Sequence, residues 1–182
     1  MFPEGPVFDR KGNLYVMNLQ GGCISKIKPN GKVSKFVETG GAPNGATISK
    51  NDYLIIADCK LKSILNIVPS GKIQVITSQY QGREFLGPND VIFGPHGNLY
   101  FTDPTGSSLK DRIGAVYCHT KQGEVFLLSE GFAYPNGIVV PSDGKTIFVA
   151  ETFTGDIHQI FLNGDGTAST ERKIWVKLGE DA

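Results

Sequence analysis

The sequence has little of several features that would place it in the more easily recognised classes of protein. It holds three cysteines among 182 residues, without a C-x-x-C spacing, which excludes a disulfide framework. Basic and acidic residues number 18 each, so the formal net charge is zero, and no basic run compensates. This balance argues against a nucleic acid or an anionic membrane as the main partner.

Long apolar runs and targeting signals are also lacking. No window approaches the roughly 18 consecutive apolar residues that a membrane span needs. The N-terminus lacks a positively charged region followed by an apolar stretch, so no signal peptide is expected. We therefore expect a soluble, cytoplasmic protein whose cysteines are reduced and structural.

Few segments have the periodicity of a helix. Apolar residues alternate or run in blocks of four to six, and Gly, Pro, Asn and Asp separate the blocks. At the start of the chain this pattern predicts strands near residues 7–8, 14–18, 24–28 and 33–37. The turn at 29–32 joins the last two strands, and its Asn-Gly pair favours a tight hairpin.

A longer pattern occurs four times along the chain. Each copy begins with a polar lead residue, enters an apolar strand, and continues through a second strand that ends in a polar residue. The lead residues are spaced 40, 45 and 47 apart, and repeats of this length built from short strands are typical of propeller blades. We predict a single all-β propeller domain over residues 1–182 with about four blades. The lead residues are Glu4, Asn44, Asn89 and Asn136.

The lead residues are candidates for a metal site. Because blades surround an axis, equivalent positions in successive blades converge at one mouth of the central channel. One carboxylate and three carboxamides are oxygen donors that suit Ca²⁺ or a similar hard cation, with water completing the shell. The alternative is that each Asn only shapes a turn, since Asn-Gly is a turn dipeptide. Four polar residues in register favour the site over the turn.

Other polar residues and insertions have expected supporting roles. His119 and His158 lie in strand pairs without metal-ligand spacing, which predicts surface positions. The segments 79–85 and 106–112 interrupt the repeat and are expected to form loops over one face.

Three carboxylates end the second strands of their repeats, and Asn18 holds this place in the first. Asp58 and Asp103 are expected to hydrogen-bond loop backbones or to support the metal ligands. Together with Glu151, these residues are expected to lie on one face of the molecule.

These residues resemble the motifs of the senescence-marker-protein/gluconolactonase family. The resemblance rests on Glu-Gly-Pro at 4–6, Gly-Pro-Asn-Asp at 87–90, Tyr-Pro-Asn-Gly at 134–137, and the carboxylate-ended strands 99–103 and 148–151. It covers essentially the whole chain. The resemblance implies a six-bladed propeller that holds a divalent metal in its channel, with Ca²⁺ expected first and Zn²⁺ or Mg²⁺ as alternatives. The activity implied is hydrolysis of sugar lactones or related esters, and some relatives cleave phosphorus–fluorine bonds.

The resemblance also assigns roles to the lead residues. Glu4, Asn89 and Asn136 resemble metal ligands, and Asn89 also resembles a residue that faces substrate. Asn44 falls where some members place a pocket residue. The expected partner is therefore a small-molecule lactone or ester.

One residue of the family pattern has no match in this chain. The family's general base or nucleophile is an Asp in the blade after the fourth, and this chain ends at Asp181-Ala182, where that blade would start. The ring is therefore expected to be incomplete at its C-terminal end, with self-association one way to complete it. Asp90, next to Asn89, is the best stand-in as a base, although strand alternation favours a role in bracing its loop.

Three functions fit this pattern. The first is a metal-dependent lactonase, in which the metal polarises the carbonyl and stabilises the developing oxyanion. The second is a non-catalytic propeller scaffold, similar to NHL-repeat proteins, and the third is an inactive family member that binds metal or ligand. Glu4 and the Asn residues in register with it favour the first and third, because a scaffold needs no oxygen donors at its axis.

Overall fold

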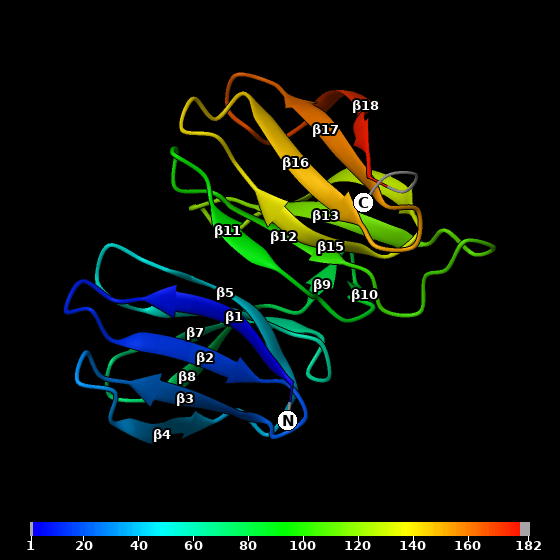
Figure 1. Cartoon of the computed structure of the whole chain (residues 1–182). Coiled ribbons are helices and arrows are strands. Elements are labelled where there is room, and N and C mark those ends of the chain that lie inside the picture. Colours follow the sequence, from blue (N-terminus) through cyan, green and yellow to red (C-terminus); the bar gives the residue numbers. More distant parts are fainter. Residues whose placement is uncertain (1, 179–182) are drawn as a thin grey trace.

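The computed structural model describes residues 2–178, and within that range the chain forms strands and no helix. The strands build four four-stranded antiparallel sheets and one two-stranded hairpin. Figure 1 shows the sheets following one another from the N-terminal to the C-terminal part of the chain. The predicted all-β class and the four repeats are confirmed. No helix of the described part is long and apolar enough to cross a membrane.

The four sheets, called blades 1 to 4 here, share one topology in which each strand pairs with the next along the chain. Blade 1 contains β1 (Pro3–Phe8), β2 (Leu14–Asn18), β3 (Cys23–Ile27) and β4 (Val33–Glu38). Blade 2 contains β5 (Pro43–Ile48), β6 (Leu54–Asp58), β7 (Ser63–Ile67) and β8 (Ile73–Thr77). Blade 3 contains β11 (Val91–Phe93), β12 (Leu99–Asp103), β13 (Gly114–His119) and β14 (Val125–Phe132). Blade 4 contains β15 (Pro135–Val139), β16 (Thr146–Glu151), β17 (Asp156–Leu162) and β18 (Ser169–Lys177).

The apolar core lies between successive blades, in three clusters. Each cluster joins one face of a blade to the facing side of the next, and fully burying one large apolar side chain contributes about 1.5–3 kcal/mol. Between blades 1 and 2 lie Tyr15, Met17, Ile24, Leu54, Ile56 and Ile67. Between blades 2 and 3 lie Ile55, Ala57, Ile64, Phe85, Val91, Leu99 and Phe101. Between blades 3 and 4 lie Tyr100, Val116, Cys118, Leu128, Phe132, Ile138, Ile147, Val149 and Ile160.

The sequence pattern of the second strand reflects the position of its blade. β6 and β12 belong to blades with a neighbour on both faces, and all their residues are buried. Their sequences are accordingly apolar runs that end in Asp. β2 and β16 belong to blades 1 and 4, and buried residues alternate along them with partly exposed ones.

The turns between third and fourth strands agree with the prediction. Gly31 adopts a φ of +80° in the turn that joins β3 to β4, a conformation that glycine adopts without steric cost. Glycines with positive φ occupy the corresponding turns of the other blades at Gly71, Gly123 and Gly166.

One of the two insertions differs from its prediction. Residues 79–85 were expected to form a surface loop, but they fold into a hairpin of β9 (Gln79–Tyr80) and β10 (Arg83–Glu84). Phe85 follows the hairpin, is buried, and packs edge-on against Phe101 with ring centroids 5.1 Å apart. The insertion therefore adds to the core between blades 2 and 3. Residues 106–112 form an irregular loop, as predicted.

Candidate functional site

The first strands of the four blades lie side by side. β1 contacts β5, β5 contacts β11, and β11 contacts β15. Glu4, Asn44 and Asn136 are the second residues of β1, β5 and β15, and Asn89 lies two residues before β11. All four therefore lie at the end of the sheet where the second strand of each blade finishes. Figure 1 shows β1, β5, β11 and β15 in this order. The fold therefore places Glu4, Asn44, Asn89 and Asn136 at equivalent positions of neighbouring strands.

Glycine after a lead residue lets the next blade approach closely. Gly45 donates a backbone hydrogen bond to the carbonyl of Asn89 at 2.7 Å. A Cβ at Gly45 would lie 2.5 Å from Cα of Asp90, and one at Gly5 would lie 2.9 Å from the backbone nitrogen of Ala46. Real Cβ contacts do not occur at these distances. Contact between blades therefore explains why glycine follows Glu4 and Asn44.

Asp90 occupies the corresponding position of blade 3 and braces two blades. Its Oδ1 accepts the backbone N–H of Val91 at 2.8 Å, and its Oδ2 accepts that of Ile138 at 3.1 Å. Burial raises the pKa of Asp90, the two backbone hydrogen bonds lower it, and the negative charge of Glu4 raises it. The bracing role expected from strand alternation agrees with these contacts.

The lead side chains differ in exposure. Asn89 is buried, Asn44 and Asn136 are half-buried, and Glu4 is exposed. The ion pairs among residues 2–178 do not include Glu4. Ca²⁺ takes six to eight oxygen ligands, and this donor set would supply part of such a shell and leave positions for water or substrate. The residues present therefore fit a hard divalent cation.

Tyr134 lies beside these residues and was not among those that the sequence predicted. Burial raises the pKa of its phenol, the charges of Cys59 and Glu4 raise it as well, and a hydrogen bond with the side chain of Asn89 lowers it. In the sequence Tyr134 is only the first residue of the Tyr-Pro-Asn-Gly motif, and nothing there shows where its side chain points.

The carboxylates at the ends of the second strands fasten the segments that lead into the first strands. Each carboxylate accepts a hydrogen bond from a backbone N–H that lies two or three residues before a lead residue. These bonds fix the position of the segment that carries the lead residue. Asp58 accepts from Ala42 at 2.8 Å, Asp103 from Gly87 at 2.6 Å, and Glu151 from Ala133 at 2.5 Å. The prediction that Asp58 and Asp103 hydrogen-bond loop backbones is confirmed.

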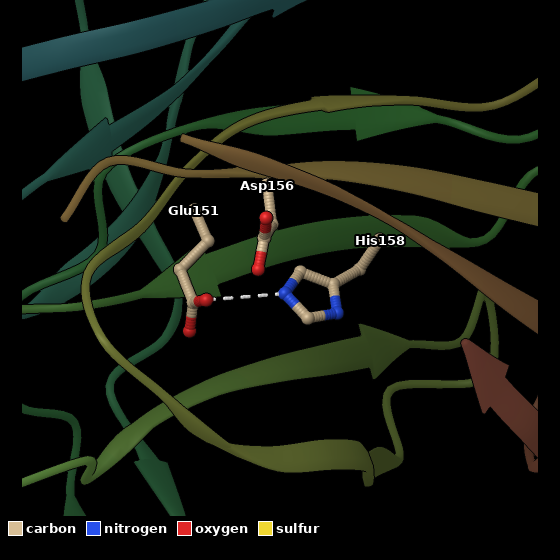
Figure 2. Close-up of side chains that lie close together, drawn as sticks. All are labelled: Glu151, Asp156 and His158. Atoms are coloured by element: carbon tan, nitrogen blue, oxygen red, sulfur yellow. Dashed lines mark hydrogen bonds and ion pairs between the residues drawn. The ribbon is translucent and has the colours of Figure 1, made fainter. Parts of the chain in front are cut away.

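Glu151 is also the centre of a buried polar cluster in blade 4, drawn in Figure 2. Nε2 of His158 lies 3.1 Å from its Oε2, and the carboxylate of Asp156 points into the same space. The predicted surface position of His158 is wrong, because its side chain is buried and its ring meets Phe132 edge-on at 5.1 Å. No spacing of residues in the sequence marks this pair.

The cluster of Glu151, Asp156 and His158 brings three candidate metal-ligand atoms within 4.8 Å of one another. However, a guanidinium nitrogen of Arg112 contacts the two Glu151 oxygens at 2.7 and 2.8 Å, and Thr154 donates to Oε2 at 2.6 Å. Burial raises the pKa of Glu151, but these donors, with His158, outweigh it and lower the pKa to about 2. Arg112 already supplies the positive charge here, so the arrangement is an ion-pair network that holds the loop 106–112 to blade 4.

Blades of four antiparallel strands, with a carboxylate and three carboxamides at the start of neighbouring first strands, define a β-propeller with a polar site on one face. The chain belongs to the SMP-30/Gluconolactonase/LRE-like family, whose model matches residues 2–182.

Curated relatives and solved structures agree with this assignment. The chain is 29% identical to the diisopropyl-fluorophosphatase of Loligo vulgaris, over 94% of the chain and 63% of that protein. It is 31% identical to the lactonase drp35 of Staphylococcus aureus strain MW2, over 90% of the chain and 52% of that protein. The chain thus spans between about half and two thirds of these relatives.

Solved structures show the same fold at lower identity. The gluconolactonase XC5397 of Xanthomonas campestris superposes with a TM-score of 0.86 at 19% identity, over 98% of the chain and 63% of that structure. The calcium-binding protein regucalcin of Agrobacterium tumefaciens gives a TM-score of 0.76 at 19% identity, over 95% of the chain and 58% of that structure.

Proposed function

We propose that this chain forms the metal-binding and substrate-contacting part of a hydrolase that opens lactones or related esters. The observation that carries the proposal is the placement of Glu4, Asn44, Asn89 and Asn136 on neighbouring first strands, in a family whose curated relatives include lactonases. Glu4, Asn89 and Asn136 would hold a divalent cation, with Ca²⁺ expected first. Asn44 and Asn89 would face the substrate.

Some residues of the site would bind the cation, and others hold the binding residues in position. With a divalent cation bound, the chemistry available is polarisation of the lactone carbonyl and a lower pKa of a coordinated water. Glu4 contributes the negative charge that attracts the cation, and the amide oxygens add neutral ligands. The hydrogen bonds from Ala133 to Glu151 and from Gly87 to Asp103 keep Asn136 and Asn89 in position.

Asp90 has a positioning part in this proposal. Both oxygens of its carboxylate accept backbone hydrogen bonds, so it holds the first strands of blades 3 and 4 together. This engagement also favours a second candidate function, in which the chain binds metal and ligand without turnover.

Hydrolysis of glucono-δ-lactone, followed by proton release, tests the proposal. We expect turnover in millimolar Ca²⁺, loss of turnover in excess chelator, and recovery when Ca²⁺ is restored. Metal binding without turnover of any lactone or aryl ester would support the inactive ligand-binding function. Absence of binding to both Ca²⁺ and Zn²⁺ would contradict the metal site and favour a scaffold.

A further inference from the structure

A pocket of about 440 Å³ lies between the outer strands of blades 3 and 4, where β14 contacts β18. These strands form the opposite edge of each sheet from the first strands β11 and β15, so the pocket is separate from the lead residues. Its volume falls within the range of small-molecule sites, about 300–1,000 Å³. None of the described residues that line it is acidic, and three carry a positive charge. The lining residues are Arg112, Gly131, His158, Arg172, Lys173 and Ile174.

Arg112 is held at the pocket by the Glu151 network. Its Nη2 donates to both oxygens of the Glu151 carboxylate at 2.7 and 2.8 Å, while 44% of the Arg112 side chain stays exposed. A guanidinium group has five N–H donors. The hydrogen bonds among residues 2–178 use only Nη2 of Arg112. The network therefore fixes the guanidinium group and uses only part of its capacity to donate.

Arg172 reaches the same pocket from β18. Its Nη1 donates to Oγ of Ser129 at 3.0 Å and to the carbonyl of Glu130 at 2.6 Å. Its guanidinium carbon lies 4.3 Å from the ring centroid of Phe132, and this same ring meets His158 edge-on. The ion pairs within the described part of the chain do not include Arg172. The guanidinium group is thus positioned by neutral groups.

His158 forms a buried wall of the pocket. Figure 2 shows its Nε2 directed at Glu151 and its Nδ1 directed away from that carboxylate. Because Nε2 is engaged, Nδ1 is the ring nitrogen that can meet a ligand. It can accept the hydrogen of a phosphate hydroxyl or, in the protonated ring, donate to a phosphate oxygen.

We propose that this pocket binds a small anion that carries a phosphate group, held between Arg112 and Arg172 and in contact with His158. Guanidinium groups recognise phosphate through paired hydrogen bonds. Burial lowers the pKa of Arg172, the charge of Glu151 raises it, and the charge of Arg112 lowers it. A phosphate dianion between the two guanidinium groups would offset their repulsion. The inference is independent of the proposed cation site and of lactone hydrolysis.

Phosphate binding to the metal-free protein tests the inference, since phosphate also coordinates cations. Isothermal titration calorimetry at constant ionic strength would use inorganic phosphate and phenyl phosphate. We expect saturable binding to the wild type. Arg172→Gln and Arg112→Lys should each raise the Kd roughly 10-fold or more, because each removes paired charge-assisted hydrogen bonds. Arg83→Gln is the matched control, because it removes an exposed guanidinium group from β10, away from the pocket, and it should keep the wild-type Kd.

The melting temperature without phosphate shows whether each variant folds. If Arg172→Gln unfolds, Arg172→Lys replaces it, because lysine keeps the charge and loses the paired donors. Tighter binding of phenyl phosphate would support a phosphate monoester as the ligand, and equal binding would support free phosphate. The inference would be overturned by a wild type that binds neither compound, by a wild-type Kd in the Arg172 variant, or by an equal loss of binding in Arg83→Gln.

Discussion

At the scale of single residues, the site depends on buried carboxylates that hold separate segments together. Glu151 is an example, because it links the segment before Asn136, the loop 106–112 through Arg112, and β17 through His158. Its side chain is fully buried, so leaving its partners unpaired would be costly. We therefore expect Glu151 to be important for stability as well as for the position of Asn136.

The pH dependence of stability tests this role. The pKa of Glu151 falls from an ordinary 4.5 to about 2 on folding, so its contribution is present above pH 4.5 and is lost as the pH falls toward 2. The difference between these two pKa values corresponds to a contribution of at most about 3 kcal/mol to the free energy of unfolding. Urea denaturation at pH 7, 4 and 3 should show Glu151→Gln less stable at pH 7, with a shallower decline than wild type.

Glu171 provides the control for this series. It lies exposed on β18 and takes part in none of the ion pairs among residues 2–178. Glu171→Gln should keep the wild-type slope. A wild-type slope in Glu151→Gln would contradict the role assigned to the network.

At the scale of elements, the first strands fit together through glycine. Gly45 and Gly137 both follow a lead Asn, but their surroundings differ. A Cβ at Gly45 would meet Asp90 and the carbonyl of Asn89, whereas one at Gly137 would meet nothing within 4 Å among the described residues.

This contrast predicts that a Gly→Ala substitution destabilises the protein more at Gly45 than at Gly137. Gly45→Ala should lower the free energy of unfolding by about 1–3 kcal/mol or more, because the backbone of blade 3 must shift. Gly137→Ala should change it by less than about 1 kcal/mol. Equal free-energy changes in chemical denaturation would show that the glycines serve local turns instead.

Some elements of the fold could be predicted from the sequence alone, and others could not. The four repeats, their strands and their hairpin turns were predictable because each blade repeats one local pattern of apolar residues and glycine turns. The hairpin at 79–85 was not, since Phe85 gains its role from contacts with Phe101 in blade 3. His158 and Tyr134 were missed for a related reason, because their partners Glu151 and Ser107 approach only through the fold.

At the scale of the whole molecule, three apolar clusters hold four blades in sequence and bring the lead residues onto one face. Lead residues from different blades can bind one ligand only if the packing between blades is maintained. We propose that Glu4, Asn89 and Asn136 bind a divalent cation together in this way.

The most direct test is the melting temperature in Ca²⁺ and in chelator, for wild type and for Glu4→Gln. A ligand that binds only the folded state stabilises it, by about 2.7 kcal/mol at a concentration of 100 times Kd. We expect Ca²⁺ to raise the wild-type Tm, Glu4→Gln to reduce this shift, and the two proteins to melt alike in chelator. No shift with Ca²⁺, or an equal shift in both proteins, would contradict this proposal.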